Sequence, residues 1–200
     1  MDLKSRIRQV LTERQKVRVG IEGHTEAAVL LPIYKGPQEH HILFTKRTEA
    51  LEKHKGQISF PGGVRHEEDG SLLDTALRES CEEIGLKPGD VEILGELDEI
   101  RTPTTLYHIT PFVGMIPHPY EFKINRSEVE EIIEVPVSVL RDPRNYWEET
   151  RIYAGKSWPI SHYRYGDRVI WGATARILKD FLALVFGEVP PLSTSQYRTG

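Results

Sequence analysis

Apolar positions along the chain change their spacing from one segment to the next, and this spacing predicts the elements. In residues 2–16 they recur three and four apart, which predicts an amphipathic helix. Short runs rich in apolar and β-branched residues predict strands at 27–34, 41–46, 58–60, 91–100 and 107–116. His40 and His41, at the start of the second run, are expected to be exposed loop residues. The last two runs are expected to pair with each other.

The second half of the chain continues this mixture. We expect a short acidic helix from residue 127 to 133, and a second short helix from Pro136 to near Pro143. Further elements are a hairpin of residues 150–153 and 159–163, an apolar closing helix at 170–186 and a loose polar tail at 190–200. The order lacks a regular βαβ alternation. It therefore predicts one α+β domain over residues 1–200, an α/β/α sandwich with a mixed sheet between helices.

Composition narrows the class of protein. The 200 residues are 38% apolar and 28% charged, as in an ordinary globular domain. A net charge of −4 disfavours a general nucleic-acid binder but does not exclude a nucleotide as substrate. No apolar run approaches the roughly 20 residues of a membrane span. The single Cys81 cannot form an internal disulfide, so we expect a cytoplasmic protein without a membrane partner.

The segment from Ser71 to Gly85 carries the most specific chemistry. Ser71 suits the N-cap of a helix and Gly85 the left-handed position after its end. At 100° per residue, one stripe is expected to be buried: Leu73, Leu77, Cys81 and Ile84. The opposite side presents Glu79, Glu82 and Glu83, and like charges so close repel one another. A divalent cation such as Mg²⁺ would offset that repulsion and bridge to phosphate oxygens.

This helix follows an apolar run and a Pro-Gly-Gly turn, and together the segments resemble the Nudix box of the Nudix hydrolases. The matching residues lie within 63–86: Gly63, Arg78, Glu79, Glu82, Glu83, Gly85 and Leu86. Relative to the family pattern, the loop is one residue longer, Asp69 stands at the first acidic position and Ser80 replaces an apolar residue. The resemblance implies the Nudix fold and, by analogy, a homodimer.

A second resemblance concerns the residues before the box. Residues 43–47, Leu51, His54, Gly56, Gln57 and 60–63 are similar to the signature of the coenzyme A diphosphatases within this superfamily. Glu52 departs from it, because that position usually carries Arg. The resemblance implies hydrolysis of the pyrophosphate bond of coenzyme A, a dinucleotide-like small molecule, to 3′,5′-ADP and 4′-phosphopantetheine.

Roles for individual residues follow from the box. Mg²⁺ or Mn²⁺ is expected on Glu79 and Glu83, with Glu82 and the backbone carbonyl of Gly62 or Gly63 sharing the site. Arg78 is expected to orient a glutamate. Three carboxylates are candidates for the general base that activates water: Glu82, Glu128 and Glu131.

Substrate contacts are expected upstream of the box. Lys46 and Arg47 carry charges suited to phosphate, but neighbours on a strand point to opposite faces, so only one is expected to reach the site. Gln57 belongs to the same signature, and His54 either contacts substrate or caps a turn. Two other functions stay open: a pyrophosphatase for ADP-ribose, NADH or a damaged nucleotide, and a non-catalytic nucleotide-binding module.

Overall fold

A mixed β-sheet forms the centre of the molecule. The computed structural model describes residues 1–20, 23–49, 56–102, 104–153 and 155–187. The sheet contains β1 (Thr25–Lys35), β2 (His40–Arg47), β3 (Ile58–Ser59), β4 (Gly62–Val64), β5 (Glu92–Glu96), β6 (Ile100–Arg101), β7 (Tyr107–Met115) and β8 (Val129–Pro136). Its order is β3-β2-β1-β7-β5, with β4 on β1, β6 on β7 and β8 on β2. Only the β1–β7 pair is parallel among these pairings, so the sheet is mixed as expected.

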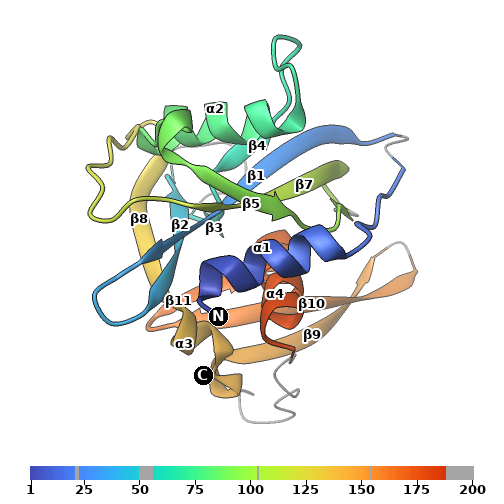
Figure 1. Cartoon of the computed structure of the whole chain (residues 1–200). Coiled ribbons are helices and arrows are strands. Elements are labelled where there is room, and N and C mark those ends of the chain that lie inside the picture. Colours follow the sequence, from blue (N-terminus) through green and yellow to red (C-terminus); the bar gives the residue numbers. More distant parts are fainter. Residues whose placement is uncertain (21–22, 50–55, 103, 154, 188–200) are drawn as a thin grey trace.

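Helices cover both faces of this sheet (Figure 1). The helix α2 (Leu72–Ile84) lies across one face, while α1 (Leu3–Glu13) and α4 (Gly172–Phe186) lie on the other. A second, three-stranded sheet packs beyond α4 and consists of β9 (Tyr146–Tyr153), β10 (Lys156–Tyr165) and β11 (Arg168–Trp171). The short helix α3 (Val137–Arg141) and the 3-10 turn η2 (Pro143–Asn145) connect β8 to it, and another 3-10 turn, η1 (Pro88–Asp90), precedes β5.

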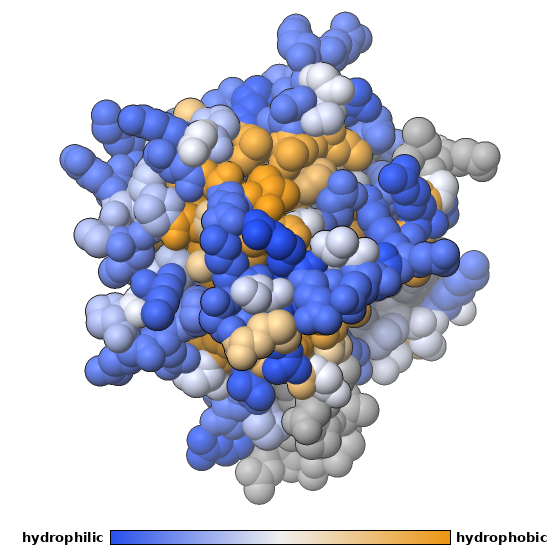
Figure 2. Space-filling view, viewed as in Figure 1, coloured by the Kyte–Doolittle hydropathy of each residue, from blue (hydrophilic) through white to orange (hydrophobic). Residues whose placement is uncertain are grey.

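The core has two parts because the central sheet is covered on both sides. On the side of α1 and α4, buried residues include Ile7, Phe44 and Phe181. On the side of α2, Leu43 of β2 packs with Ile84 of the helix and other apolar residues. Each large side chain removed from water contributes about 1.5–3 kcal/mol. Figure 2 shows apolar surface between α2 and β5, ringed by hydrophilic residues.

Most elements expected from the sequence are present, with shifted ends. The expected N-terminal helix is α1, and the expected strand pair at 91–116 is found as β5, β6 and β7. The hairpin is longer than expected, and the closing helix begins only at Gly172 because residues 168–171 form β11. The tail at 190–200 lies outside the described residues.

Two local predictions are wrong. The acidic segment at 127–133 is not a helix; β8 begins at Val129 and pairs antiparallel with β2. Glutamates favour helix locally, but Val129, Ile133 and Val135 are buried against the sheet, and that packing overrides propensity. His40 and His41 are not loop residues either: both belong to β2, and the His41 ring stacks on Tyr34 with 5.1 Å between centroids.

No helix among the residues that the structure describes has the length and apolarity needed to cross a membrane.

Candidate functional site

Local signals set the ends of α2. The Ser71 hydroxyl accepts a hydrogen bond from the Asp74 backbone N–H at 3.2 Å, which satisfies one free donor of the first turn. Gly85 has φ 70° and donates its N–H to the Cys81 carbonyl at 2.9 Å. Glycine adopts this left-handed conformation without steric cost. Both predicted ends of the helix are confirmed.

The predicted buried stripe of α2 is confirmed at Ile84 and wrong at Cys81. Cys81 is exposed, whereas Ser80 and Glu83 are buried with Ile84. The Ser80 hydroxyl donates to the Ala76 carbonyl at 2.7 Å, which explains how this position tolerates burial without an apolar side chain. The helix therefore turns part of its carboxylate face toward the sheet instead of away from it.

Two glycines of β4 make room for those carboxylates. A Cβ added at Gly63 would lie 2.5 Å from the carboxyl carbon of Glu79, so the Glu79 carboxylate rests against the glycine backbone. Gly62 has φ 151°, and a Cβ there would meet the Ala28 carbonyl of β1 at 2.3 Å. Side chains at these positions would displace either the carboxylate or the strand pairing.

Arg78 links the acidic residues of the box. Its Nε and Nη2 atoms donate to the two Asp69 oxygens at 2.9 and 3.0 Å, a bidentate pair. Its Nη1 atom donates to Glu79 at 2.9 Å and to Glu82 at 3.1 Å. Asp69 also accepts from the Thr75 hydroxyl at 2.8 Å. The Arg78 guanidinium holds the pKa of Asp69 far below its usual range, and Arg78 is thereby fixed beside Glu79.

Glu83 is the most buried carboxylate of this group, with 2% of its side chain exposed. Its Oε1 atom lies 3.7 Å from Nη1 of Arg47, and its Oε2 atom has no hydrogen-bond partner. Burial raises the pKa of Glu83 to about 8, against the opposing effect of the Arg47 charge. Burial also raises the pKa of Glu79, against the opposing effect of Arg78. Positive charge supplied from outside would stabilise both ionised forms.

Glu128 approaches the same carboxylates from the loop before β8. Its negative charge adds to the effect of burial, which raises the pKa of both Glu79 and Glu83. The Asn125 side-chain amide donates to Glu128 at 3.1 Å, and the Asn125 backbone N–H donates to the Glu83 carbonyl at 2.9 Å. This loop therefore ties Glu128 to the C-terminal end of α2.

Other expected site residues lie elsewhere. Glu131 accepts from Arg168 at 2.8 Å, and Lys46 pairs with Glu130 at 3.0 Å. Lys46 and Arg47 point to opposite faces of β2, and Arg47 is the one placed beside the box. The Gln57 carbonyl accepts from the Arg47 backbone N–H at 3.0 Å. His54 and Glu52 lie outside the described residues.

Glu79 and Glu83 fit a hard divalent cation by their chemistry. Carboxylate oxygens are the ligands that Mg²⁺ and Mn²⁺ prefer, and Glu83 holds one buried oxygen without a partner. Among the described residues, no three Asp, Glu, His or Cys side chains already stand close enough to hold a metal ion. Glu82 explains part of this, since it is 53% exposed and bonded to Arg78.

Sequence reasoning missed two contributors to this site. It recorded Asp69 only as a departure from a pattern, although Asp69 anchors Arg78; the i+9 spacing to an arginine was the available signal. It gave no role to residues 123–125, whose backbone N–H groups bond the last carbonyls of α2. No local sequence pattern predicts these backbone hydrogen bonds, because they join segments that are far apart along the chain.

Comparisons with known proteins agree with this geometry. The NUDIX domain model matches residues 24–155. Proteins named "Uncharacterized Nudix hydrolase NudL" from Shigella flexneri and from Escherichia coli (strain SMS-3-5 / SECEC) are 36% identical over 178 residues, 84% of this chain and 85% of theirs. A solved NUDIX hydrolase from Alicyclobacillus acidocaldarius is similar in fold, with a TM-score of 0.50, 18% identity and coverage of 82% of this chain and 91% of its own.

Proposed function

The chain belongs to the NUDIX domain family and is a pyrophosphohydrolase, and from that premise we propose that it hydrolyses the pyrophosphate bond of coenzyme A or a derivative. The products are 3′,5′-ADP and 4′-phosphopantetheine or its acyl form. The cofactor is Mg²⁺ or Mn²⁺, held by Glu79 and Glu83. The non-catalytic module is set aside, because the relatives that match over most of the chain are named hydrolases.

The observation that carries the substrate proposal is the position of Arg47. Arg47 belongs to the segment 43–63 that resembles the coenzyme A diphosphatase signature, and its guanidinium lies 3.7 Å from Glu83. A guanidinium beside a metal-binding carboxylate is well placed to donate to the phosphate oxygens that the cation also contacts. Arg47, from the upstream signature, thus offers a phosphate contact next to Glu83, from the box.

The reaction places water on one phosphorus while the other phosphate leaves. A Mg²⁺ or Mn²⁺ ion held by Glu79 and Glu83 would supply positive charge for the phosphoryl oxygens and would lower the pKa of a water molecule. Arg78 holds Glu79 in place through their 2.9 Å hydrogen bond, and Asp69 holds Arg78. Both residues position the site and need not touch substrate.

Glu128 is our choice for the general base among the three candidates. Its charge acts on Glu79 and Glu83, and the Asn125 amide orients its carboxylate. Glu131 is paired with Arg168, which lies outside the box. Glu82 is exposed and is paired with Arg78, a residue of the box, and we rank it as the second candidate. A cytoplasmic homodimer, also part of this proposal, is tested by sedimentation and by fractionation.

The alternative substrate class is ADP-ribose, NADH or a damaged nucleotide. The feature that favours it is Glu52, which stands where the coenzyme A signature usually carries Arg. A glutamate close to the additional phosphate of coenzyme A would repel that phosphate. It would not weaken the binding of a dinucleotide that lacks the phosphate.

Hydrolysis of coenzyme A, ADP-ribose, NADH and 8-oxo-dGTP by the full chain, with Mg²⁺ or Mn²⁺, tests the proposal. Products are separated by chromatography. A lead in kcat/KM for coenzyme A, with 3′,5′-ADP as product, supports the proposed substrate. A lead for ADP-ribose or NADH transfers the assignment to the alternative class.

A further inference from the structure

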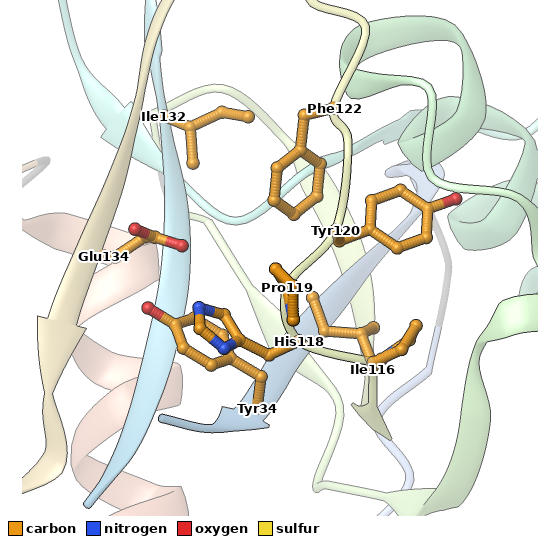
Figure 3. Close-up of a pocket in the computed structure, with 9 residues that line it drawn as sticks. Tyr34, Ile116, His118, Pro119, Tyr120, Phe122, Ile132 and Glu134 are labelled. Carbon is orange, nitrogen blue, oxygen red and sulfur yellow. The ribbon is translucent and has the colours of Figure 1, made fainter. Parts of the chain in front are cut away.

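A cavity of about 300 Å³ opens on the same face of the sheet as α2 (Figure 3). Its lining includes Tyr34 of β1, Ile132 and Glu134 of β8, and three residues of the segment after β7: His118, Tyr120 and Phe122. In Figure 3 the Tyr34 and His118 rings overlap, Glu134 lies beside them, and Ile132 and Phe122 face them across the opening. The volume is at the lower end of the range for small-molecule sites, about 300–1,000 Å³.

Two of the lining residues, Tyr34 and His118, belong to a stack of three rings whose third member, His41, lies outside the lining. Tyr34 stacks on His118 with 4.5 Å between centroids and 6° between planes, and on His41 at 5.1 Å and 4°. Glu134 lies beside Tyr34, and burial together with the Glu134 carboxylate raises the pKa of the Tyr34 hydroxyl. Tyr120 is also fixed, since its hydroxyl donates to Asp90 at 3.0 Å. Stacked rings held by such contacts form a rigid aromatic surface.

The cavity adjoins the candidate active site through β2 and through the loop before β8. Glu134 and Ile132 pair with Leu43 and Thr45 of β2, and Arg47 lies two residues beyond Thr45 at the end of that strand. Side chains two positions apart on a strand lie about 7 Å apart. Phe122 precedes Lys123, whose N–H donates to the Ile84 carbonyl of α2 at 2.9 Å. The cavity and Glu83 are therefore connected through β2 and β8 and through the segment that bonds the end of α2.

The lining selects for a neutral planar ring that donates a hydrogen bond. Four of its named side chains are aromatic and offer ring faces or edges for stacking. Among the described residues that line it there is no Lys or Arg, which disfavours a phosphate group. Glu134 is the one carboxylate in that lining, and an ionised carboxylate only accepts hydrogen bonds. A nucleobase with an exocyclic amino group satisfies all three conditions.

We propose that this cavity is the subsite for an amino-substituted nucleobase, adenine in the substrates considered above, with Glu134 accepting a hydrogen bond from its amino group. The proposal rests on the proposed function, because it assigns the base of the same substrate whose pyrophosphate is cleaved. It holds for coenzyme A, ADP-ribose and NADH alike, since all three carry adenine.

Binding of adenosine and inosine to the full chain without metal, followed by NMR titration, tests the subsite apart from catalysis. Inosine has a carbonyl in place of the amino group and would face the Glu134 carboxylate with an acceptor. Adenosine is expected to bind about fivefold more tightly than inosine, the effect of one hydrogen bond at a partly exposed carboxylate. Equal binding of the two nucleosides, or shifts confined to residues outside the cavity, overturns the proposal.

Two variants and a control sharpen the result. Glu134→Gln can both donate and accept, so it should remove the preference for adenosine. Ile132→Phe fills the cavity and should weaken adenosine at least tenfold, while Glu149→Gln on the exposed part of β9 should change neither. Thermal melts verify folding. A folded Ile132→Phe variant that binds adenosine like the wild type, or a folded Glu134→Gln variant that keeps the preference for adenosine over inosine, overturns the subsite.

Hydrolysis assays on the same samples distinguish a failure of the base subsite from a failure of the proposed function. If adenosine binds as expected but no adenine pyrophosphate is cleaved with Mg²⁺ or Mn²⁺, the subsite stands and the proposed function fails. If NADH is cleaved but its hypoxanthine analogue is cleaved equally well, the function stands and the base subsite is overturned.

Discussion

Nη1 of Arg47 lies 3.7 Å from Oε1 of Glu83, and this contact joins the two segments that the sequence singled out for different reasons. Arg47 ends β2, which is part of the upstream signature, and Glu83 lies near the end of the box helix. The strand and the helix meet where a phosphate would need both a cation ligand and a guanidinium.

Replacing Arg47 with Ala should lower kcat/KM about 10–100-fold, because a charge-assisted hydrogen bond to phosphate contributes about 1.5–3 kcal/mol. Lys46→Ala is the matched control, since Lys46 is its chain neighbour on the opposite face of β2 and pairs with Glu130. Steady-state kinetics on the preferred substrate measure both variants. Equal losses in the two would contradict a specific phosphate contact by Arg47.

Glu83→Gln should lose at least about 100-fold in kcat, the scale of removing one transition-state electrostatic contact, while keeping its stability within about 1 kcal/mol. Burial raises the pKa of Glu83 to about 8, so in the metal-free protein the carboxyl is largely protonated at pH 7 and resembles the amide. Urea unfolding without metal and kinetics with Mg²⁺ give the two quantities. Near wild-type turnover would remove Glu83 from the metal site.

Glu128→Gln and Glu131→Gln distinguish the candidate bases. The Glu128 variant should lower kcat about 100-fold with little change in KM, the usual scale of general-base catalysis. The Glu131 variant should stay within threefold, because Glu131 is paired with Arg168. A loss confined to Glu131→Gln would reverse the assignment, and Glu82→Gln tests the remaining candidate.

Asp69 should make the stability of the fold depend on acid pH. The Arg78 guanidinium lowers the pKa of Asp69 in the folded chain from the 3.8 of a free carboxyl. The unfolded chain therefore takes up this proton first, and the stabilisation, full above about pH 4, is lost as pH falls below 3.8. Asp69→Asn should cost about 1–3 kcal/mol at pH 7.

Urea unfolding of wild type and Asp69→Asn at pH 7, 5, 4 and 3 measures this effect. The difference in unfolding free energy between them should be constant from pH 7 to 5 and narrow below pH 4. If the difference did not change with pH, Asp69 would stabilise the fold through packing and neutral hydrogen bonds and not through its charge beside Arg78.

The sequence predicts the features that depend on neighbouring residues. It does not predict the features that depend on contacts between distant segments. The ends of α2 follow from Ser71 and Gly85, since capping involves residues within one turn. Its buried face does not, because the residues that pack against the carboxylates come from other strands: Gly63 lies against Glu79, and Arg47 lies beside Glu83. The prediction for β8 fails for the same reason. Its glutamates favour a helix locally, but pairing with β2 makes the segment a strand.

The cavity was also beyond sequence reasoning. Tyr34, His118 and Glu134 are far apart along the chain, and no spacing in the sequence connects them. They meet only because β1 lies between β2 and β7 in the sheet, while β8 lies on the other side of β2.

The segment between β7 and β8 touches both the cavity and helix α2. The N–H groups of Lys123 and Asn125 donate to the Ile84 and Glu83 carbonyls, and the Tyr120 and Phe122 side chains, which line the cavity, pack in the core cluster that contains Ile84. A substitution at the cavity therefore also bears on the end of the helix that carries Glu83. Redirecting substrate choice through this segment would need replacements that keep its packing against α2.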